Sequence, residues 1–247
     1  MQVNHIYHGD CLEVMRDIPD KSIDCIICDL PYGTTACSWD TVIPFEPLWE
    51  QYKRIVKDNA AIVLFGSQPF TTFLIASCLD MFRYELIWEK SRPSNCLLAN
   101  KMPLKYHENI ILFYKSLPVY NPEKTKGQKN HKSKIGITKS NIHNTVIESE
   151  INVDDMKYPR SVIKSKSLDP TQSIHPTQKP VALLEYLIKT YTNEGDLILD
   201  NCSGSGSTCV AAINTNRRYI GIEKDKTYYE LSLKRIKETI DKTALFN

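Results

Sequence analysis

The sequence predicts an α/β fold with a mainly parallel central sheet. In residues 1–115 and 172–247, short apolar runs alternate with stretches of helical apolar spacing. This alternation is typical of βαβ units, in which helices cover both faces of the sheet. Residues 116–171 lose the periodicity and are dominated by Lys, Asn, Ser and Thr, so we interpret them as an insertion into the α/β domain.

Each element of the first region follows from its local pattern. Residues 5–8 predict a short strand that runs into Gly9-Asp10, and residues 12–18 a short helix that ends at Pro19. The apolar run at 23–28, rich in isoleucine, indicates a buried strand. Similar patterns predict helices at 45–56 and 70–79 and strands at 60–66, 84–88 and 108–114.

The second region resumes the same alternation. Pro180 begins a helix that reaches Tyr191, because the apolar side chains at 181, 184, 187 and 188 share one face. Residues 196–200 and 218–222 predict strands, residues 207–214 a helix, and residues 226–240 an amphipathic final helix.

Composition indicates an ordinary globular protein. Of 247 residues, 42% are hydrophobic and 24% charged, and no run of eighteen apolar residues or signal peptide appears, so we expect neither a membrane span nor secretion. The 8 cysteines lie mostly in apolar runs, which predicts reduced thiols and a cytoplasmic location. We expect no metal site, because Cys25-x-x-Cys28 lacks a second pair at ligand spacing and no histidines have metal-ligand spacing.

The tetrapeptide Asp29-Leu30-Pro31-Tyr32 directly follows the predicted strand at 23–28. Ligands of open α/β sheets bind at the carboxyl ends of the strands. A carboxylate, a main-chain carbonyl and an aromatic ring at this place could hold a planar amine such as a nucleobase. Simple turn chemistry is the alternative interpretation of Asp29.

A glycine-rich turn, Ser203-Gly204-Ser205-Gly206, follows the strand at 196–200. The dinucleotide pattern would need a third glycine where Cys209 stands, and no phosphate-binding Gly-Lys-Ser/Thr follows, so a nucleoside-like cofactor without a pyrophosphate is expected. Glu223 ends the next strand and could bind a ribose diol. The alternative is that Glu223 complements a helix dipole, with Asp225 as the helix N-cap.

The insertion carries a cluster of lysines beside a single acid, Glu123. A cluster of this kind is an electrostatic footprint for a polyanion, or else a solvated mobile loop, and charge alone does not decide between them. The lysines are Lys124, Lys126, Lys129, Lys132, Lys134 and Lys139.

Together these motifs resemble the β-class DNA amino-methyltransferases, which methylate adenine N6 or cytosine N4 with S-adenosylmethionine. Asp29-Leu30-Pro31-Tyr32 resembles the D/S-P-P-Y catalytic motif, and residues 175–180 match H-P-T-Q-K-P without change. Residues 200–208 resemble the cofactor motif D-P-F-x-G-S-G-T-T, with departures at Asn201, Cys202 and Ser207. The catalytic motif precedes the cofactor loop, and this order is typical of the β class.

The resemblance implies a Rossmann-like class I methyltransferase fold with circularly permuted motif order. Its implied catalytic residues are Asp29, Leu30, Pro31 and Tyr32: the carboxylate and the Leu30 carbonyl would bind the target amine, and Tyr32 would stack on a flipped base. Leu30 replaces the usual proline, which affects the side chain rather than the carbonyl. An aspartate at the first position resembles the adenine-N6 subgroup more than the cytosine-N4 subgroup.

The resemblance also implies the cofactor contacts. Asp200 and the following residues Asn201, Cys202, Ser203, Gly204, Ser205 and Gly206 would lie near the methionine part. Thr177 and Lys179 would approach its carboxylate, Glu223 the ribose, and Asp10, with Cys11 beside it, the adenine. The alternatives are a solvated lysine at position 179 and a helix cap at Asp10.

We therefore expect an adenine-N6 methyltransferase of double-stranded DNA, with residues 116–171 as its target-recognition insertion and Trp39 covering the site. Cytosine-N4 methylation, RNA methylation and a catalytically inactive DNA-binding module are the alternatives. The family also leaves open a homodimer and a cognate restriction endonuclease.

Overall fold

The computed structural model describes residues 1–35, 37, 40–128, 138–139, 146–147, 155–166 and 178–244. The chain forms two compact units, one made of residues 1–121 and 161–247 and the other of residues 122–160. Among the described residues, no helix combines the length and the apolar character that crossing a membrane requires.

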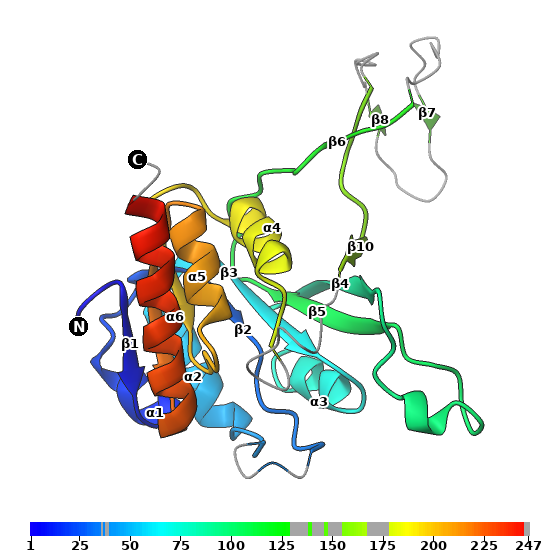
Figure 1. Ribbon diagram of the computed structural model, residues 1–247. Coiled ribbons are helices and arrows are strands. Elements are labelled where there is room, and N and C mark those ends of the chain that lie inside the picture. The colour runs from blue at the N-terminus through cyan, green and yellow to red at the C-terminus, as the bar shows by residue number, and fades with distance from the viewer. Residues whose placement is uncertain are drawn as a thin grey trace. The chain divides into compact units, whose positions relative to one another are not determined.

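The larger unit is built on an eight-stranded sheet with the order β1-β12-β11-β2-β3-β5-β4-β10 (Figure 1). The strands from β1 to β3 in this order are parallel, β5 is antiparallel to both β3 and β4, and β10 is parallel to β4. The strands are β1 (His5–His8), β2 (Ile23–Cys28), β3 (Val56–Gly66), β4 (Phe82–Lys90), β5 (His107–Phe113), β10 (Val162–Ser165), β11 (Leu197–Asp200) and β12 (Arg218–Glu223). The predicted mainly parallel sheet is confirmed.

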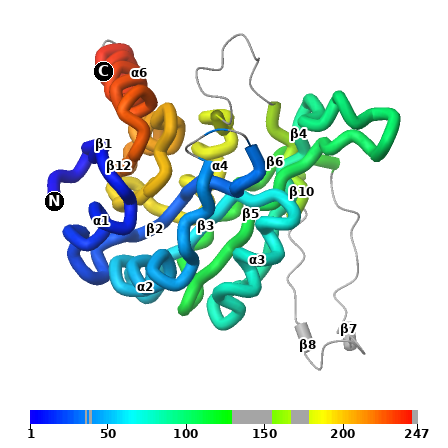
Figure 2. The backbone as a smooth tube through the Cα atoms, turned by 90° about the horizontal axis from the view of Figure 1, so that it is seen from below, coloured from blue at the N-terminus to red at the C-terminus, as the bar shows by residue number. Residues whose placement is uncertain are grey.

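Helices cover both faces of this sheet. Figure 2 shows α1, α2 and α3 on one side and α4, α5 and α6 on the other. The helices are α1 (Cys11–Val14), α2 (Phe45–Ile55), α3 (Phe70–Ala76), α4 (Val181–Tyr191), α5 (Ser207–Asn214) and α6 (Lys226–Ala244), with short 3-10 helices η1 (Met15–Asp17) and η2 (Cys96–Leu98).

Strand β2 shows why the central strands read as continuous apolar runs. Cys25 and Ile27 belong to the core on the α4–α6 side, whereas Ile26 and Cys28 belong to the core on the α1–α3 side. A strand buried on both faces needs apolar residues at every position. Because Cys25 and Cys28 point to opposite faces, they are not a redox pair, and all 8 cysteines are free.

Two strands differ from the sequence prediction. β3 begins at Val56 rather than at residue 60, and Val56 pairs with Ile23 of β2. β10 lies within the predicted insertion, yet it pairs with β4 from Ile87 to Lys90. β10 is a four-residue edge strand whose side chains are half-buried or exposed. It therefore has no apolar run from which a strand could be predicted.

The smaller unit contains short antiparallel pairs. β6 (Thr125–Lys126) pairs with β9 (Met156–Lys157), and β7 (Thr138–Lys139) with β8 (Val146–Ile147). Lys124 Nζ lies 4.4 Å from the centroid of the Tyr158 ring, and Lys126 Nζ 3.6 Å from a carboxylate oxygen of Asp155. Of the other predicted DNA-binding lysines, Lys139 is described only by its backbone, and Lys129, Lys132 and Lys134 lie outside the described residues.

Candidate active site

The fold brings the tetrapeptide and the glycine-rich loop to one edge of the sheet. β2 and β11 are adjacent and parallel, with Ile26 paired to Leu199, so Asp29 and Asp200 leave the sheet at the same end. One cavity is lined by both segments and by the residues before α4: Asp29, Phe65, Gln178, Lys179, Leu184, Asp200, Cys202, Ser203, Gly204, Ser205, Ser207 and Thr208. Adjacent parallel strands thus place motifs about 170 residues apart around a single space.

Both carboxylate oxygens of Asp29 accept a hydrogen bond. The Tyr32 hydroxyl donates to Oδ1 at 2.6 Å, and Lys179 Nζ donates to Oδ2. Burial raises the pKa of Asp29, and the Lys179 ammonium and the Tyr32 hydroxyl oppose that rise. The pKa of Asp29 is raised overall, and these two hydrogen-bond donors limit that rise and favour the charged, accepting carboxylate.

A second carboxylate extends this network. Lys179 Nζ lies 3.3 Å from Glu108 Oε2, and Lys90 Nζ donates to Glu108 Oε1 at 2.9 Å. Burial raises the pKa of Glu108, but the two ammonium groups outweigh it and lower that pKa. Two acids and two lysines alternate, so the charges of the network balance.

Sequence reasoning missed Glu108 and Lys90. A usable signal existed, because Lys90 lies two residues after the strand predicted at 84–88 and Glu108 begins the strand predicted at 108–114. Consecutive strands of a hairpin place two such residues at the same edge of a sheet, and β4 and β5 form this hairpin.

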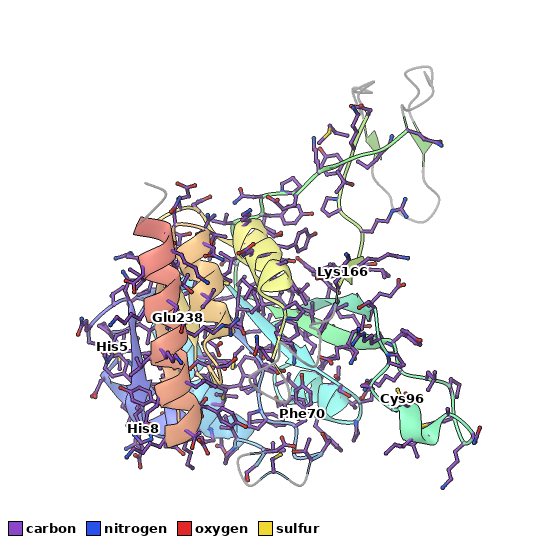
Figure 3. The ribbon with its side chains drawn as sticks, viewed as in Figure 1. His5, His8, Phe70, Cys96, Lys166 and Glu238 are labelled. Atoms are coloured by element: carbon purple, nitrogen blue, oxygen red, sulfur yellow. The ribbon has the colours of Figure 1, made fainter. Side chains whose placement is uncertain are left out.

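Contacts with the rest of the protein hold the side chains of Leu30 and Tyr32 in place. Leu30 is 3% exposed and its side chain belongs to the core beneath α1–α3. The Tyr32 ring lies 4.9 Å from that of Phe70, at an interplanar angle of 31°. Phe70 begins α3 and is labelled in Figure 3. With its side chain buried, what Leu30 can offer a ligand is its main chain.

Asp40 organises the loop after Tyr32. Its carboxylate accepts hydrogen bonds from the backbone N–H groups of Gly33 (2.9 Å), Thr34 (2.9 Å) and Thr35 (2.7 Å). Burial raises the pKa of Asp40, but these hydrogen bonds outweigh it and lower the pKa. Asp40 was not among the predicted site residues, and its neighbour Trp39 lies outside the described residues.

The glycine-rich loop needs its glycines. Gly204 and Gly206 have φ values of +50° and +76°, in the left-handed region that side chains disfavour. A Cβ on Gly206 would also lie 3.1 Å from the Ser232 side chain in α6. The loop therefore passes close under α6, and its backbone lines the cavity.

Glu223 and Asp10 both make structural contacts. Glu223 Oε2 accepts from Gly204 N and Oε1 from Asp225 N, each at 2.7 Å, while Asp225 accepts from Thr227 N at 2.8 Å as an N-cap. Asp10 accepts from Leu12 N at 2.9 Å, so it makes the helix cap that was the alternative to its predicted adenine contact. Its other oxygen lies 3.0 Å from Lys224 Nζ. Ribose and adenine contacts for these two acids stay predictions.

The remaining predicted cofactor residues divide by environment. Asp200 is 4% exposed and accepts from Cys202 N at 3.2 Å, and burial raises its pKa to about 6. Asn201 accepts a hydrogen bond from the Tyr52 hydroxyl of α2 at 2.5 Å, so it anchors the loop. Cys11 is buried at the start of α1, and Thr177 lies outside the described residues.

The cavity suits a small ligand with a cationic group and hydroxyls. Asp29 and Asp200 line it with carboxylates, and the buried Ser203 Oγ has no hydrogen-bond partner among the residues that the structure describes. A buried hydroxyl without a partner is costly unless a ligand supplies one. Within the same described part, no three His, Cys, Asp or Glu side chains gather as metal ligands.

Comparison with known proteins agrees with this geometry. The sequence profile of a family described as DNA methylase (N6_N4_Mtase) matches residues 23–234. Type II methyltransferase M2.MboI of Moraxella bovis is 28% identical, covering 95% of this chain and 88% of that protein. DNA adenine methyltransferase YhdJ of Escherichia coli K12 is 27% identical, covering 94% and 82%. The crystal structure of the M1.HpyAVI–SAM complex is 26% identical, with a TM-score of 0.64, covering 94% and 98%.

Proposed function

The chain belongs to the DNA methylase family and is an S-adenosylmethionine-dependent DNA amino-methyltransferase, and from this premise we propose that it methylates adenine N6 in double-stranded DNA. One observation carries the proposal: Asp29 shares a cavity with the Asp200–Thr208 loop. An aspartate at the first motif position supports adenine over cytosine, and so does the name of the relative YhdJ, a DNA adenine methyltransferase.

Asp29 and Leu30 would prepare the target amine. An exocyclic amine is conjugated with its ring, so its lone pair is poorly available for attack. Acceptance of one hydrogen by the Asp29 carboxylate and the other by the Leu30 carbonyl would draw the nitrogen toward tetrahedral geometry and free that lone pair. The bound cofactor supplies a methyl group on a positively charged sulfur.

Lys179 would keep Asp29 an acceptor throughout. A carboxylate has about four acceptor positions, so Asp29 can receive an amine hydrogen while Lys179 keeps its bond. A protonated Asp29 would instead carry a hydrogen where the amine hydrogen must be accepted. We assign Lys179 primarily to this positioning role, and its predicted contact with the cofactor carboxylate stays a second proposal.

The tyrosine and the polar loop would hold the two substrates. Tyr32, supported by Phe70 and tied to Asp29 through its hydroxyl, would stack on an adenine extruded from the duplex. Asp200, Ser203 and the glycine-rich backbone would bind the amino-acid part of the cofactor, with Thr177 near its carboxylate. Glu223 would bind the ribose, and Asp10 the adenine.

Target recognition is proposed for residues 116–171. Lys124 and Lys126 lie in the smaller unit, where they could contact phosphates and give salt-dependent affinity. Lys129, Lys132, Lys134 and Lys139 belong to the same proposal. A homodimer, a cognate restriction endonuclease and a cytoplasmic location stay predictions.

Nucleoside mass spectrometry tests the proposal. The purified chain is incubated with unmodified plasmid DNA and S-adenosylmethionine, and the digested DNA is analysed for methylated nucleosides. N6-methyladenine is expected, and Asp29→Ala should abolish it while cofactor binding by calorimetry stays nearly intact. N4-methylcytosine without N6-methyladenine would establish the cytosine alternative, and absence of cofactor binding would indicate an inactive DNA-binding module.

A further inference from the structure

Residues 91–106 form a projecting hairpin extension between β4 and β5, here called the arm (Figure 1). Its two sides are joined by backbone hydrogen bonds, among them Ser94 N to Lys105 O at 3.1 Å and Lys90 N to Tyr106 O at 2.7 Å. The Asn95 side chain crosses the arm, accepting from Lys105 N and donating to the Pro103 carbonyl. The arm is thus an ordered structure, with η2 near its tip.

The side chains on this ordered arm are apolar and exposed. Figure 3 shows Cys96 of η2 beyond the sheet and its helices. Its neighbour Leu97 is fully exposed, and four more large hydrophobic side chains are exposed on the arm: Leu98, Met102, Leu104 and Tyr106. Ordering a loop costs conformational entropy, and here burial of these side chains within the chain does not offset that cost. Grouped exposed apolar residues on an ordered element mark a binding surface.

The charge of the arm indicates what it binds. Its sixteen residues contain Arg92, Lys101 and Lys105 and no aspartate or glutamate. Lys105 is held at the base, where its ammonium donates to the Ser67 hydroxyl, while Lys101 is exposed near the apolar tip. Positive charge beside apolar side chains suits a polyanion whose interior is apolar, and a base stack flanked by phosphates has this composition.

The base of the arm belongs to the catalytic network. Lys90, the last residue of β4, immediately precedes the arm, and Glu108 of β5 lies just after it. The Lys90 ammonium donates a hydrogen bond to the Glu108 carboxylate at 2.9 Å. Glu108 in turn lies 3.3 Å from Lys179 Nζ, which donates to Asp29. Glu108 and Lys179 thus connect the foot of the arm to Asp29. The foot of the arm therefore has a fixed position relative to the adenine that we propose is methylated.

We propose that the arm is a DNA-contacting wedge. It inserts Leu97 and its apolar neighbours beside the base pair that loses its adenine, while Lys101 contacts a phosphate. Extruding a base costs unstacking energy, and an apolar side chain placed against the opened stack offsets part of that cost. This inference rests on the proposed function, because it assigns the arm to the same duplex substrate.

Leucine-to-alanine substitutions test the wedge on two DNA substrates. Leu97→Ala should lower the methylation rate on unmodified plasmid duplex about tenfold, as expected from the loss of one apolar contact with a stack. On the same plasmid after heat denaturation, the loss should be under about twofold, because no stack has to be opened. Leu97 is exposed, so the variant should fold.

Leu79→Ala is the matched control. Leu79 is also exposed, at 65%, but it precedes β4, whereas the arm follows β4. A nine-residue strand separates the two leucines by roughly 30 Å. Leu79→Ala should leave both rates unchanged, and a Leu97→Ala variant that behaves like it would overturn the proposal.

Binding measurements separate this inference from the proposed function. In anisotropy titrations with a labelled duplex of mixed sequence, Lys101→Ala should reduce the slope of log affinity against log salt by about one. If the wild-type chain methylates no DNA but Lys101→Ala and Leu97→Ala still weaken duplex binding, the proposed function fails and the arm remains a DNA contact. Equal losses on both substrates, with a shift from dimer to monomer in sedimentation, would instead make the arm an interface between copies.

Discussion

Lys179, just before α4, donates a hydrogen bond to the carboxylate of Asp29, at the end of β2. The two side chains are 8% and 19% exposed, so solvent contributes little to keeping either one charged. Each partner stabilises the charge of the other: burial lowers the pKa of Lys179, and the neighbouring carboxylates of Asp29 and Glu108 outweigh it and raise that pKa.

Removing this ammonium should shift the pH dependence of methylation. In Lys179→Met, burial would raise the pKa of Asp29 with only the Tyr32 hydroxyl left to oppose it, and the proposed mechanism requires the deprotonated carboxylate. The acidic limb of the pH–rate profile, measured at saturating cofactor, should therefore move to higher pH. Lys90→Met, which removes a partner of Glu108 only, is the control and should shift the limb less. An acidic limb identical to that of the wild type would show that Lys179 does not set the ionisation of Asp29.

Asp40 should hold the conformation of the loop after Tyr32 and should not contribute to cofactor binding. Asp40→Ala removes an acceptor of three backbone N–H groups, each bond to a charged group being worth about 1.5–3 kcal/mol. We expect the methylation rate to fall roughly tenfold or more and the thermal midpoint to drop by several degrees, with the cofactor Kd unchanged. Asp40→Asn, which keeps one acceptor oxygen, should be intermediate.

The matched control for Asp40 is Asp58→Ala. Asp58 is a surface carboxylate paired with the exposed Lys21 and Lys115, and exposed pairs contribute little. Its removal should change neither rate nor midpoint appreciably. Should Asp40→Ala weaken cofactor binding as much as it slows methylation, the loop would have to be assigned to the cofactor instead.

The sequence predicted best the parts of the fold whose burial leaves a local pattern. Residues 23–28 were recognised as a strand because both faces of β2 are buried, and every position but Asp24 is therefore apolar. β10 left no such trace, because an edge strand with half-exposed side chains is held by backbone pairing to β4. Backbone pairing does not depend on side-chain pattern, so only tertiary structure reveals this strand.

The same distinction applies to the site. Asp29 and Asp200 were predicted because Asp29 follows an apolar strand, Asp200 ends one, and each belongs to a contiguous motif. Glu108 and Lys90 belong to no contiguous motif, and in the sequence they look like ordinary charges at strand ends. Their role comes from the antiparallel turn of β4 onto β5, which closes a network with a lysine some 70 residues further along the chain.

Glu223 offers a test that separates ribose binding from loop support. Glu223→Gln keeps an oxygen for one of the two backbone N–H groups but loses the charge. If Glu223 binds the diol, calorimetry should show about tenfold weaker binding of S-adenosylmethionine, and little change for an analogue without the ribose hydroxyls. Asp225→Asn, which retains an N-cap side chain, is the control and should bind both ligands normally. Equal weakening for the two ligands would mean that Glu223 only supports the loop.

Asp200 should make cofactor binding depend on pH. Burial raises the pKa of its carboxyl to about 6, so Asp200 is charged at pH 8 and mostly protonated at pH 5. In the proposed complex, a cationic amino group of the cofactor would bind the Asp200 carboxylate, and binding below the pKa would first have to release a proton. The Kd for S-adenosylmethionine should therefore be flat above pH 7 and rise below pH 6, approaching tenfold per pH unit.

Asp200→Asn should remove that dependence. The amide keeps the acceptor for Cys202 N but not the charge, so its Kd should be about tenfold or more weaker at pH 8 and nearly constant down to pH 5. Asp196→Asn is the matched control, because Asp196 precedes β11 at the end opposite Asp200 and accepts a hydrogen bond from Asn193 N. It should keep the wild-type profile. A wild-type Kd that is constant from pH 5 to pH 8 would remove Asp200 from the cofactor contacts, because a carboxylate of pKa about 6 that binds a cation has to show this linkage.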